Sequence, residues 1–143
     1  MITGASRGIG LALVKWFSAN QHKVWAISRN KKPITQLNLP NVTSSTLDLT
    51  DEAAVLAWSQ NMAPDIIDAL INNAGKLLNK PFADTQQSDF ETVFRVNVFG
   101  LANITRALLK KLQPGGHVVN ISSMGGIGGT LKFPGLAAYS SSK

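Results

Sequence analysis

The sequence predicts an α/β fold with a doubly wound parallel sheet, and three observations carry this prediction. Short apolar runs alternate with segments of helical periodicity along the whole chain. The apolar runs are nearly continuous, which is typical of strands that helices cover on both faces. A glycine-rich turn joins the first run to the first helical segment. The 143 residues show no internal repeat, so we expect a single domain over residues 1–143.

The expected elements follow one another as strand, helix and strand. Strands are expected at residues 1–2, 23–28, 42–47, 66–71 and 117–121, and helices at 8–20, 51–61, 88–112 and from 137 onward. Thr50 is the expected N-cap of the second helix, and Ser88 with Glu91 matches a capping box for the third. Pro33 and Pro40 indicate an irregular stretch between the second and third strands. The run at 117–121 has the composition of a buried strand.

Composition excludes several kinds of chemistry. The chain has no cysteine, which rules out disulfides, thiolate nucleophiles and cysteine-based zinc or iron–sulfur sites. Only two histidines occur, and they are far apart in the sequence, so we expect no metal site. No apolar run of about 18 residues and no signal-peptide pattern is present, which predicts a cytoplasmic protein without membrane contact.

The charge balance is basic, with 14 Lys+Arg against 8 Asp+Glu and a formal net charge of +6. The basic residues are scattered, and most aromatic residues lie inside apolar periodic segments. A nucleic-acid surface needs clustered cations with exposed aromatic side chains, so no nucleic-acid partner is expected. An anionic small-molecule ligand explains the excess of positive charge better than a nucleic acid does.

The turn after the first strand reads Thr-Gly-Ala-Ser-Arg-Gly-Ile-Gly over residues 3–10. Glycines there allow a tight turn, close approach of the backbone to a pyrophosphate, and close packing of helix on strand. The following helix N-terminus offers free N–H groups to phosphates. The spacing is a variant of the dinucleotide fingerprint, and a glycine turn without a ligand is the alternative interpretation. The candidate cofactor-binding residues in this turn are Gly4, Ser6, Arg7, Gly8, Ile9 and Gly10.

The residue after the second strand bears on the choice of cofactor. Proteins that bind NAD place an acidic residue there to hold the ribose hydroxyls. Here Arg29 occupies the region and no carboxylate is present. Arg29 and Arg7 could hold a 2′-phosphate by charge-assisted hydrogen bonds, which predicts NADP(H) in preference to NAD(H), whereas a solvated surface arginine is the alternative. Asp48 and Leu49, after the third strand, are candidate adenine contacts.

The single tyrosine, Tyr139, precedes Lys143 by four positions, a spacing that places both side chains on one face of a helix. A cation about 4 Å away stabilises a phenolate by up to ~4 kcal/mol at an effective dielectric of 20, which favours acid–base transfer near neutral pH. An ordinary surface helix is the alternative.

Two further sites depart from the local sequence pattern, and such departures often mark functional sites. One is Asn97, which is surrounded by large apolar residues in the sequence. The other is the pair Ser122 and Ser123, which follows the fifth strand.

Taken together and in order, these features resemble the short-chain dehydrogenase/reductase family, in its smaller type with TGxxxGxG and YxxxK. The matching positions are Thr3 to Gly10, Asp48, Asn72 to Gly75, Asn97, Ser123, Tyr139 and Lys143. The resemblance implies a Rossmann fold and hydride transfer between NADP(H) and a carbonyl or alcohol substrate. It also implies that Asn73, Ala74 and Gly75 line the cofactor.

The same resemblance assigns catalytic roles. Tyr139 would be the acid–base residue, and Lys143 would make its phenol a stronger acid and bind the nicotinamide ribose. Ser123 would donate a hydrogen bond to the substrate oxygen, with Ser122 as the other candidate. Asn97 would hold a water that relays protons to Lys143. The substrate itself stays open.

The family domain normally continues beyond Lys143 through two more strands and a substrate-covering segment, and its first strand is longer. We therefore expect residues 1–143 to be a domain truncated at both ends, inactive and poorly folded if the chain stops at Lys143. The family also implies a homodimer or homotetramer packed through the helices at 88–112 and from Tyr139. Two alternatives to the oxidoreductase remain: a regulatory protein that binds a dinucleotide without catalysis, and a nucleotide-sugar epimerase or dehydratase.

Overall fold

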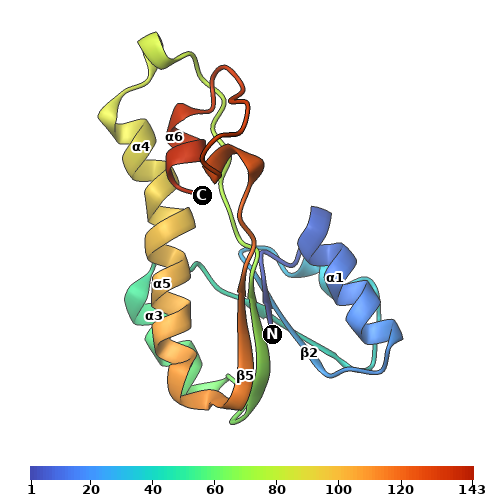
Figure 1. Cartoon of the computed structure of the whole chain (residues 1–143). Helices are drawn as coiled ribbons and strands as arrows, with labels where there is room; N and C mark the ends of the chain where they lie inside the picture. The colour runs from blue at the N-terminus through green and yellow to red at the C-terminus, as the bar shows by residue number, and fades with distance from the viewer.

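Five parallel strands form one sheet at the centre of the molecule (Figure 1). The computed structural model describes residues 1–143, with the strands in the spatial order β3-β2-β1-β4-β5. The strands are β1 Ile2–Thr3, β2 Val24–Ser28, β3 Val42–Thr46, β4 Ile67–Asn72 and β5 Leu112–Asn120. The chain starts in the middle, winds outward to β3, and returns across β1 to β4 and β5. This order confirms the predicted doubly wound parallel sheet.

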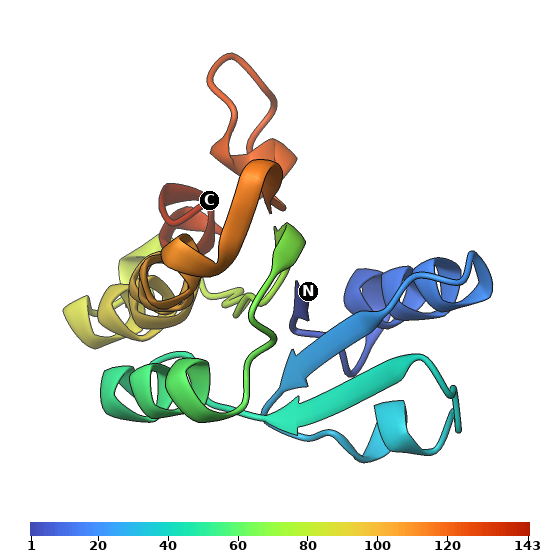
Figure 2. The same cartoon turned by 90° about the horizontal axis from the view of Figure 1, so that it is seen from below.

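Helices lie on both sides of the sheet, with α1 on one side and α3 and α5 on the other (Figure 2). The α-helices are α1 Gly8–Ala19, α2 Lys32–Thr35, α3 Glu52–Asn61, α4 Gln87–Phe94, α5 Leu101–Leu108 and α6 Ala137–Ser141. The remaining helical segments are a π-helix, η2 Arg95–Gly100, and the 3₁₀ turns η1 Phe82–Asp84, η3 Leu109–Lys111 and η4 Met124–Gly126. No helix has both the length and the apolar character that crossing a membrane requires.

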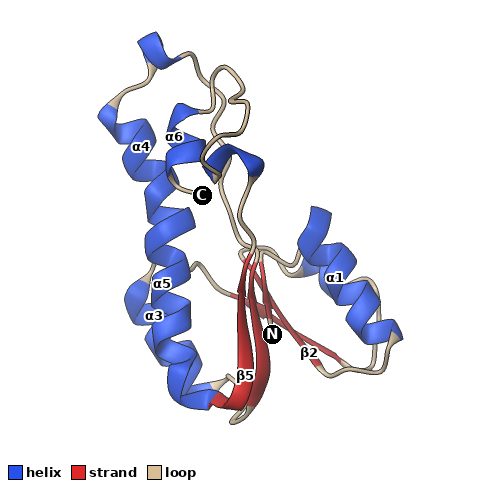
Figure 3. Cartoon of the chain, in the orientation of Figure 1, coloured by secondary structure: helices blue, strands red, loops and turns tan.

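The helix predicted over 88–112 exists, but it is not a uniform α-helix. It begins at Gln87, passes through the π-helical turn η2 between α4 and α5, and ends in the 3₁₀ turn η3 at Lys111. In Figure 3 these segments form one long rod beside the sheet. A sequence pattern with a period near 3.6 does not distinguish a π-turn from the α-helix around it.

The fifth strand is longer than predicted and is not buried. β5 begins at Leu112, directly after the helix, so Pro114-Gly115-Gly116 lies inside the strand instead of before it. The register against β4 shifts over this stretch, and such irregularities are where a strand tolerates proline and glycine. Val118 and Val119 stay partly exposed because β5 is the last strand of the sheet and has a neighbour on one side only.

Both predicted N-terminal caps of helices are wrong by one or two residues. Asp51, not Thr50, caps α3, because its Oδ1 accepts a hydrogen bond from the backbone N–H of Ala54 at 2.9 Å. The capping box of α4 consists of Gln86 and Asp89, since the helix starts early enough to place Ser88 inside its first turn.

The stretch that we expected to be irregular contains the short helix α2. Pro33 stands in its first turn, where a missing N–H costs nothing because helix starts leave that donor unpaired anyway. This four-residue helix buries Ile34 against the α1 side of the sheet.

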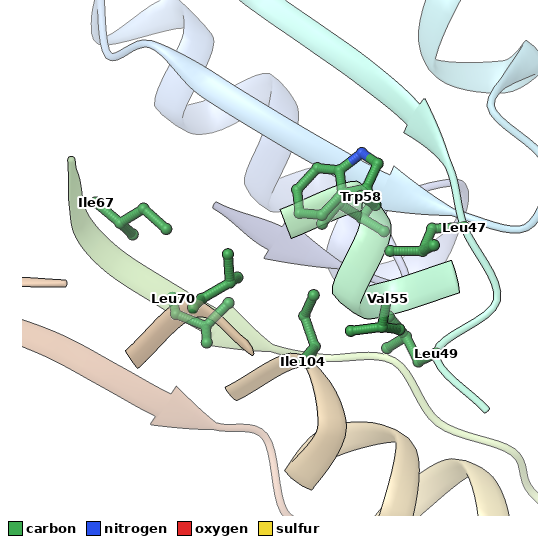
Figure 4. Packing of buried hydrophobic residues seen from close by; sticks show 9 residues of the cluster. Leu47, Leu49, Val55, Trp58, Ile67, Leu70 and Ile104 are labelled. Atoms are coloured by element: carbon green, nitrogen blue, oxygen red, sulfur yellow. The ribbon is translucent and has the colours of Figure 1, made fainter. Parts of the chain in front are cut away.

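Two hydrophobic clusters lie on the two faces of the sheet. The cluster on the α3 and α5 side holds Trp58 from α3, and Leu70 from β4 packs there against Ile104 from α5 (Figure 4). The members of this cluster are Ile27, Leu47, Leu49, Val55, Trp58, Ile67, Leu70, Ile104 and Leu108. The cluster on the α1 side consists of Ile2, Ala5, Val14, Val24, Ala26, Ile34 and Ile71. Both clusters include residues of β2 and β4, so these strands are packed against helices on both faces of the sheet.

Two adjacent leucines on the long helix test this packing. Leu108 is fully buried (0% exposed), whereas Leu109 is 60% exposed. Leu108→Ala is expected to lower the free energy of unfolding by about 2–5 kcal/mol, because it leaves a cavity in the core. Leu109→Ala is expected to change it by less than about 0.5 kcal/mol. Denaturant unfolding of both variants measures the difference, and equal losses would contradict this assignment of the core.

Candidate cofactor cleft and active site

The glycine loop between β1 and α1 adopts a conformation that side chains would disrupt. Gly4 and Gly8 have φ of +63° and +53°, in the left-handed region. A Cβ on Gly4 would stand 2.7 Å from the Cα of Ala74, and one on Gly10 would stand 2.3 Å from the carbonyl oxygen of Gly4. Close backbone contacts therefore require glycine at positions 4 and 10, and the positive φ favours glycine at position 8, before any ligand is considered.

Hydrogen bonds join this loop to the segment after β4. The Thr3 hydroxyl oxygen accepts hydrogen bonds from the backbone N–H groups of Asn73 and Ala74, both at 3.1 Å. The Asn73 side chain donates in return to the carbonyl oxygens of Thr3 and Gly4, at 3.0 and 3.1 Å. The spacing of the motif placed Thr3 in the loop but gave no sign that its hydroxyl holds the neighbouring segment.

A cleft of about 580 Å³ opens at the carboxyl ends of the central strands. It lies where the strand order reverses between β1 and β4, which is the place where open α/β sheets bind ligands. The predicted cofactor residues that line it are Gly4, Ser6, Arg7, Gly8, Ile9, Arg29, Asp48, Leu49, Asn73, Ala74 and Gly75. The lining residues that were not predicted to bind the cofactor are Ile27, Ser28, Asn30, Pro33, Leu47, Thr50 and Val96. Gly10, Tyr139 and Lys143 are not among the lining residues.

The lining of the cleft combines two arginines with one carboxylate. Arg7 and Arg29 both line it, together with Asp48. The backbone N–H of Thr50 and its hydroxyl each donate a hydrogen bond of 2.9 Å to Asp48 Oδ1. The backbone hydrogen bond is the main cause that lowers the pKa of Asp48, and the nearby charge of Arg29 adds to it. Asp48 is therefore a carboxylate at neutral pH, able to accept hydrogen bonds from a ligand.

Asn97 lies in the π-helix η2, and its amide is fully engaged. Its Oδ1 accepts a hydrogen bond from the backbone N–H of Lys76 at 2.7 Å. Its Nδ2 donates to the carbonyl oxygen of Lys76 at 3.1 Å and to Oγ of Ser142 at 2.8 Å. These contacts explain a buried asparagine inside an apolar helix. They use both hydrogens of Nδ2, so a water at this residue would have to bind an oxygen atom instead.

Lys143 lies next to Gly75, one of the residues that line the cleft. Its ammonium donates a hydrogen bond to the carbonyl oxygen of Ile121, and burial lowers the pKa of Lys143. A Cβ placed on Gly75 would stand 3.8 Å from Lys143 Nζ and 3.5 Å from Asn97 Oδ1. Both side chains therefore meet at Gly75, which lines the cleft.

The two candidate serines differ in how their hydroxyls are used. Ser122 Oγ donates a hydrogen bond of 2.7 Å to the carbonyl oxygen of Lys143. Ser123 Oγ instead accepts one from the backbone N–H of Gly125 at 3.2 Å, where it caps η4. The hydroxyl hydrogen of Ser123 thus remains available to an oxygen of a ligand, whereas that of Ser122 is taken.

Tyr139 lies in α6, which packs against both η4 and α4. The loops after β4 and β5 also meet at this end of the molecule, since Lys80 donates its backbone N–H to the carbonyl oxygen of Gly135 at 2.8 Å (Figure 1). The Tyr139 hydroxyl makes no hydrogen bond to the protein. Chemically, a hydroxyl with a free hydrogen can donate a hydrogen bond or a proton to an oxygen atom, and an ammonium can stabilise the negative charge that results. Ser123 and Tyr139 provide such hydroxyls, and Lys143 provides the ammonium.

Comparison with known proteins agrees with this geometry. The model of the short chain dehydrogenase family matches residues 1–143. Carbonyl reductase [NADPH] 2 of Sus scrofa is 35% identical over 149 residues, which cover 100% of this chain and 59% of that protein. The chain therefore belongs to the short-chain dehydrogenase family, a family of oxidoreductases.

Solved structures of other dehydrogenases share the fold. The closed form of serine dehydrogenase complexed with NADP⁺ superposes with a TM-score of 0.84 at 30% identity, over 99% of this chain and 59% of that one. For 4-hydroxyisoleucine dehydrogenase complexed with NADH and succinate the TM-score is 0.81 at 28% identity, over 99% and 65%. The chain thus spans less than two thirds of the length of these relatives.

The Thr3 hydroxyl provides a test of how the cleft is built. Thr3→Val keeps the shape of the side chain but leaves two N–H groups without their acceptor, at a cost of about 1–3 kcal/mol for each buried donor. Thr3→Ser keeps the acceptor and is the matched control, expected to lose far less. Thermal unfolding compares the two variants, and equal destabilisation would show that the hydroxyl does not hold the segment after β4.

Proposed function

We propose that the protein is an NADP(H)-dependent oxidoreductase that transfers a hydride between the nicotinamide and a carbonyl or alcohol substrate. The observation that carries this proposal is the convergence of Lys143 and Asn97 on Gly75, at the wall of a cleft whose floor is the glycine loop. The similarity to an NADPH-dependent carbonyl reductase supports it.

The cleft fits a dinucleotide in shape and in chemistry. Its volume is within the range of small-molecule and cofactor sites, and the floor at Gly4 leaves no room for a Cβ. The first turn of α1 faces it with backbone N–H groups suited to phosphates. Gly4, Ser6, Arg7, Gly8, Ile9 and Gly10 would hold the pyrophosphate, and Asp48 with Leu49 the adenine. Asn73, Ala74 and Gly75 would line the path to the nicotinamide.

The nicotinamide, when bound, supplies or accepts the hydride, and the side chains handle the proton. In the direction of reduction, Ser123 donates a hydrogen bond to the carbonyl oxygen of the substrate. Tyr139 gives its hydroxyl proton to that oxygen as the carbonyl carbon is reduced. The Lys143 ammonium stabilises the resulting phenolate and, as a donor, can hold the ribose of the cofactor. Asn97 fixes the segment at Lys76 and, through an oxygen atom, would bind the water that returns a proton.

Arg29 and Arg7 favour NADP(H) over NAD(H), because a guanidinium binds a phosphate through paired, charge-assisted hydrogen bonds. No acidic side chain stands at the end of β2 to accept the hydroxyl groups of an NAD ribose. The resemblance to the family implies association of subunits through the long helix and α6, and Phe99 is an apolar side chain that the long helix exposes.

The cofactor preference can be measured by titrating the protein with NADPH and with NADH. NADPH is expected to bind more tightly, and Arg29→Ala is expected to weaken NADPH binding by about 10–100-fold, the value of a charged hydrogen bond. The affinity for NADH should stay the same. Lys15→Ala, which removes a positive charge from α1 away from the cleft, is the control and should leave both affinities unchanged. Equal affinity of the unaltered protein for both cofactors would overturn the NADP(H) assignment.

The role of Tyr139 can be tested by replacing its hydroxyl with hydrogen. Tyr139→Phe is expected to lower the rate of carbonyl-dependent NADPH oxidation by about 10²–10⁴-fold, since general acid catalysis contributes on this scale. Binding of NADPH should persist. Loss of NADPH absorbance with a panel of carbonyl compounds gives the rate. Tight NADPH binding by the unaltered protein without turnover of any carbonyl would favour a regulatory dinucleotide-binding protein instead.

A further inference from the structure

Ser142 is a buried polar residue that the proposed mechanism does not use. It stands between Tyr139 and Lys143 in the sequence and is only 8% exposed. Its hydroxyl oxygen accepts a hydrogen bond from Asn97 Nδ2 at 2.8 Å and donates one to the carbonyl oxygen of Tyr139 at 2.7 Å. It therefore links α6 directly to the π-helix η2.

Ser142 directly follows α6, Ala137–Ser141, the helix that carries Tyr139. Its last turn is closed by tight bonds between residues three apart: the N–H of Ser142 binds the carbonyl oxygen of Tyr139 at 3.0 Å. The Ser142 hydroxyl adds a second hydrogen bond to that same oxygen.

The connection continues beyond Asn97 to the wall of the cleft. The amide of Asn97 is tied on its other side to both backbone groups of Lys76, the residue after Gly75. A continuous path of hydrogen bonds thus runs from the cleft-lining segment through Asn97 and Ser142 to the backbone of Tyr139. Because two hydrogen bonds to Lys76 hold the side chain of Asn97 independently of Ser142, it gives α6 a fixed reference.

The neighbouring serine shows that this arrangement is specific to one position. Ser141 is exposed, and its hydroxyl binds only the carbonyl oxygen of Ala138, inside the same helix. Such a local bond fixes nothing relative to the rest of the molecule. Ser141 is therefore a matched control for Ser142, with the same side chain one position away.

We propose that Ser142 is a positioning residue: its hydroxyl holds Tyr139 and Lys143 in place against the long helix. It touches neither substrate nor cofactor and acts through Asn97 and the Tyr139 backbone. The importance of Ser142 for function rests on the proposed roles of Tyr139 and Lys143. Its effect on the placement of the Tyr139 side chain can be measured without any assay of activity.

The single tyrosine of the chain makes this measurement direct. With isotope-labelled tyrosine, the ring gives NMR signals from Tyr139 alone, so their chemical shifts report the surroundings of this side chain. Ser142→Ala is expected to shift or broaden the Tyr139 ring signals and to weaken NADP⁺ binding several-fold, because Lys143 loses its fixed place near Gly75. Ser141→Ala should leave both measurements as in the unaltered protein. Ser142→Thr, which keeps the hydroxyl, should restore most of both.

Two further outcomes would overturn the proposal. Tyr139 signals that stay unchanged in Ser142→Ala would show that the hydroxyl does not position the residue, and an equal shift in Ser141→Ala would show that the effect is not specific. If Ser142→Ala fails to fold, Ser142→Cys preserves the size of the side chain with a much weaker hydrogen bond and answers the same question. Failure of the unaltered protein to bind NADP⁺ would instead contradict the proposed function and leave the ring-signal test intact.

Discussion

The close contact between the glycine loop and the segment after β4 is the constraint on which the cleft depends. These two segments are about seventy residues apart in the sequence, yet Thr3 and Asn73 exchange hydrogen bonds at 3.0–3.1 Å. Such closeness is achieved because Gly4 and Gly10 have no side chains to separate the backbones. A single contact thereby aligns β1 with β4 and shapes the floor of the cleft between them.

The sequence predicted the fold well where a pattern repeats. Alternation of apolar runs and helical periodicity identified all five strands, and their winding follows from the parallel βαβ rule. Boundaries were less accurate for a physical reason. The caps of α3 and α4 depend on which of several neighbouring polar side chains reaches a free N–H group, and Thr50, Asp51, Gln86 and Ser88 are all suitable in chemistry. Only the three-dimensional path of the chain decides among them.

For the candidate site, too, the sequence predicted some features and not others. Residues on the glycine loop and after each strand could be named from sequence, because parallel strands bring their carboxyl ends to one edge of the sheet. The hydrogen-bond partner of each hydroxyl group could not be predicted from the sequence. Ser122 and Ser123 are adjacent and have the same side chain, and they differ only in the hydrogen-bond partners of their hydroxyl groups. The sequence also did not predict that the Thr3 hydroxyl binds backbone N–H groups of the protein itself. Nor did its periodicity predict the π-helical turn that contains Asn97. Widened turns of this kind occur often at functional sites, since they reorient a side chain without ending the helix.

The last strand of the sheet has a consequence of a different kind. β5 is nine residues long, its outer backbone groups face no other strand, and Val118 and Val119 remain partly exposed. An open edge with apolar side chains is a template onto which another extended chain can add by backbone hydrogen bonds, and proteins normally cover such edges or break them with charges. The register is irregular only at its beginning, between Leu112 and His117. A segment that adds to this edge would pair the outer backbone groups of β5 and cover Val118 and Val119.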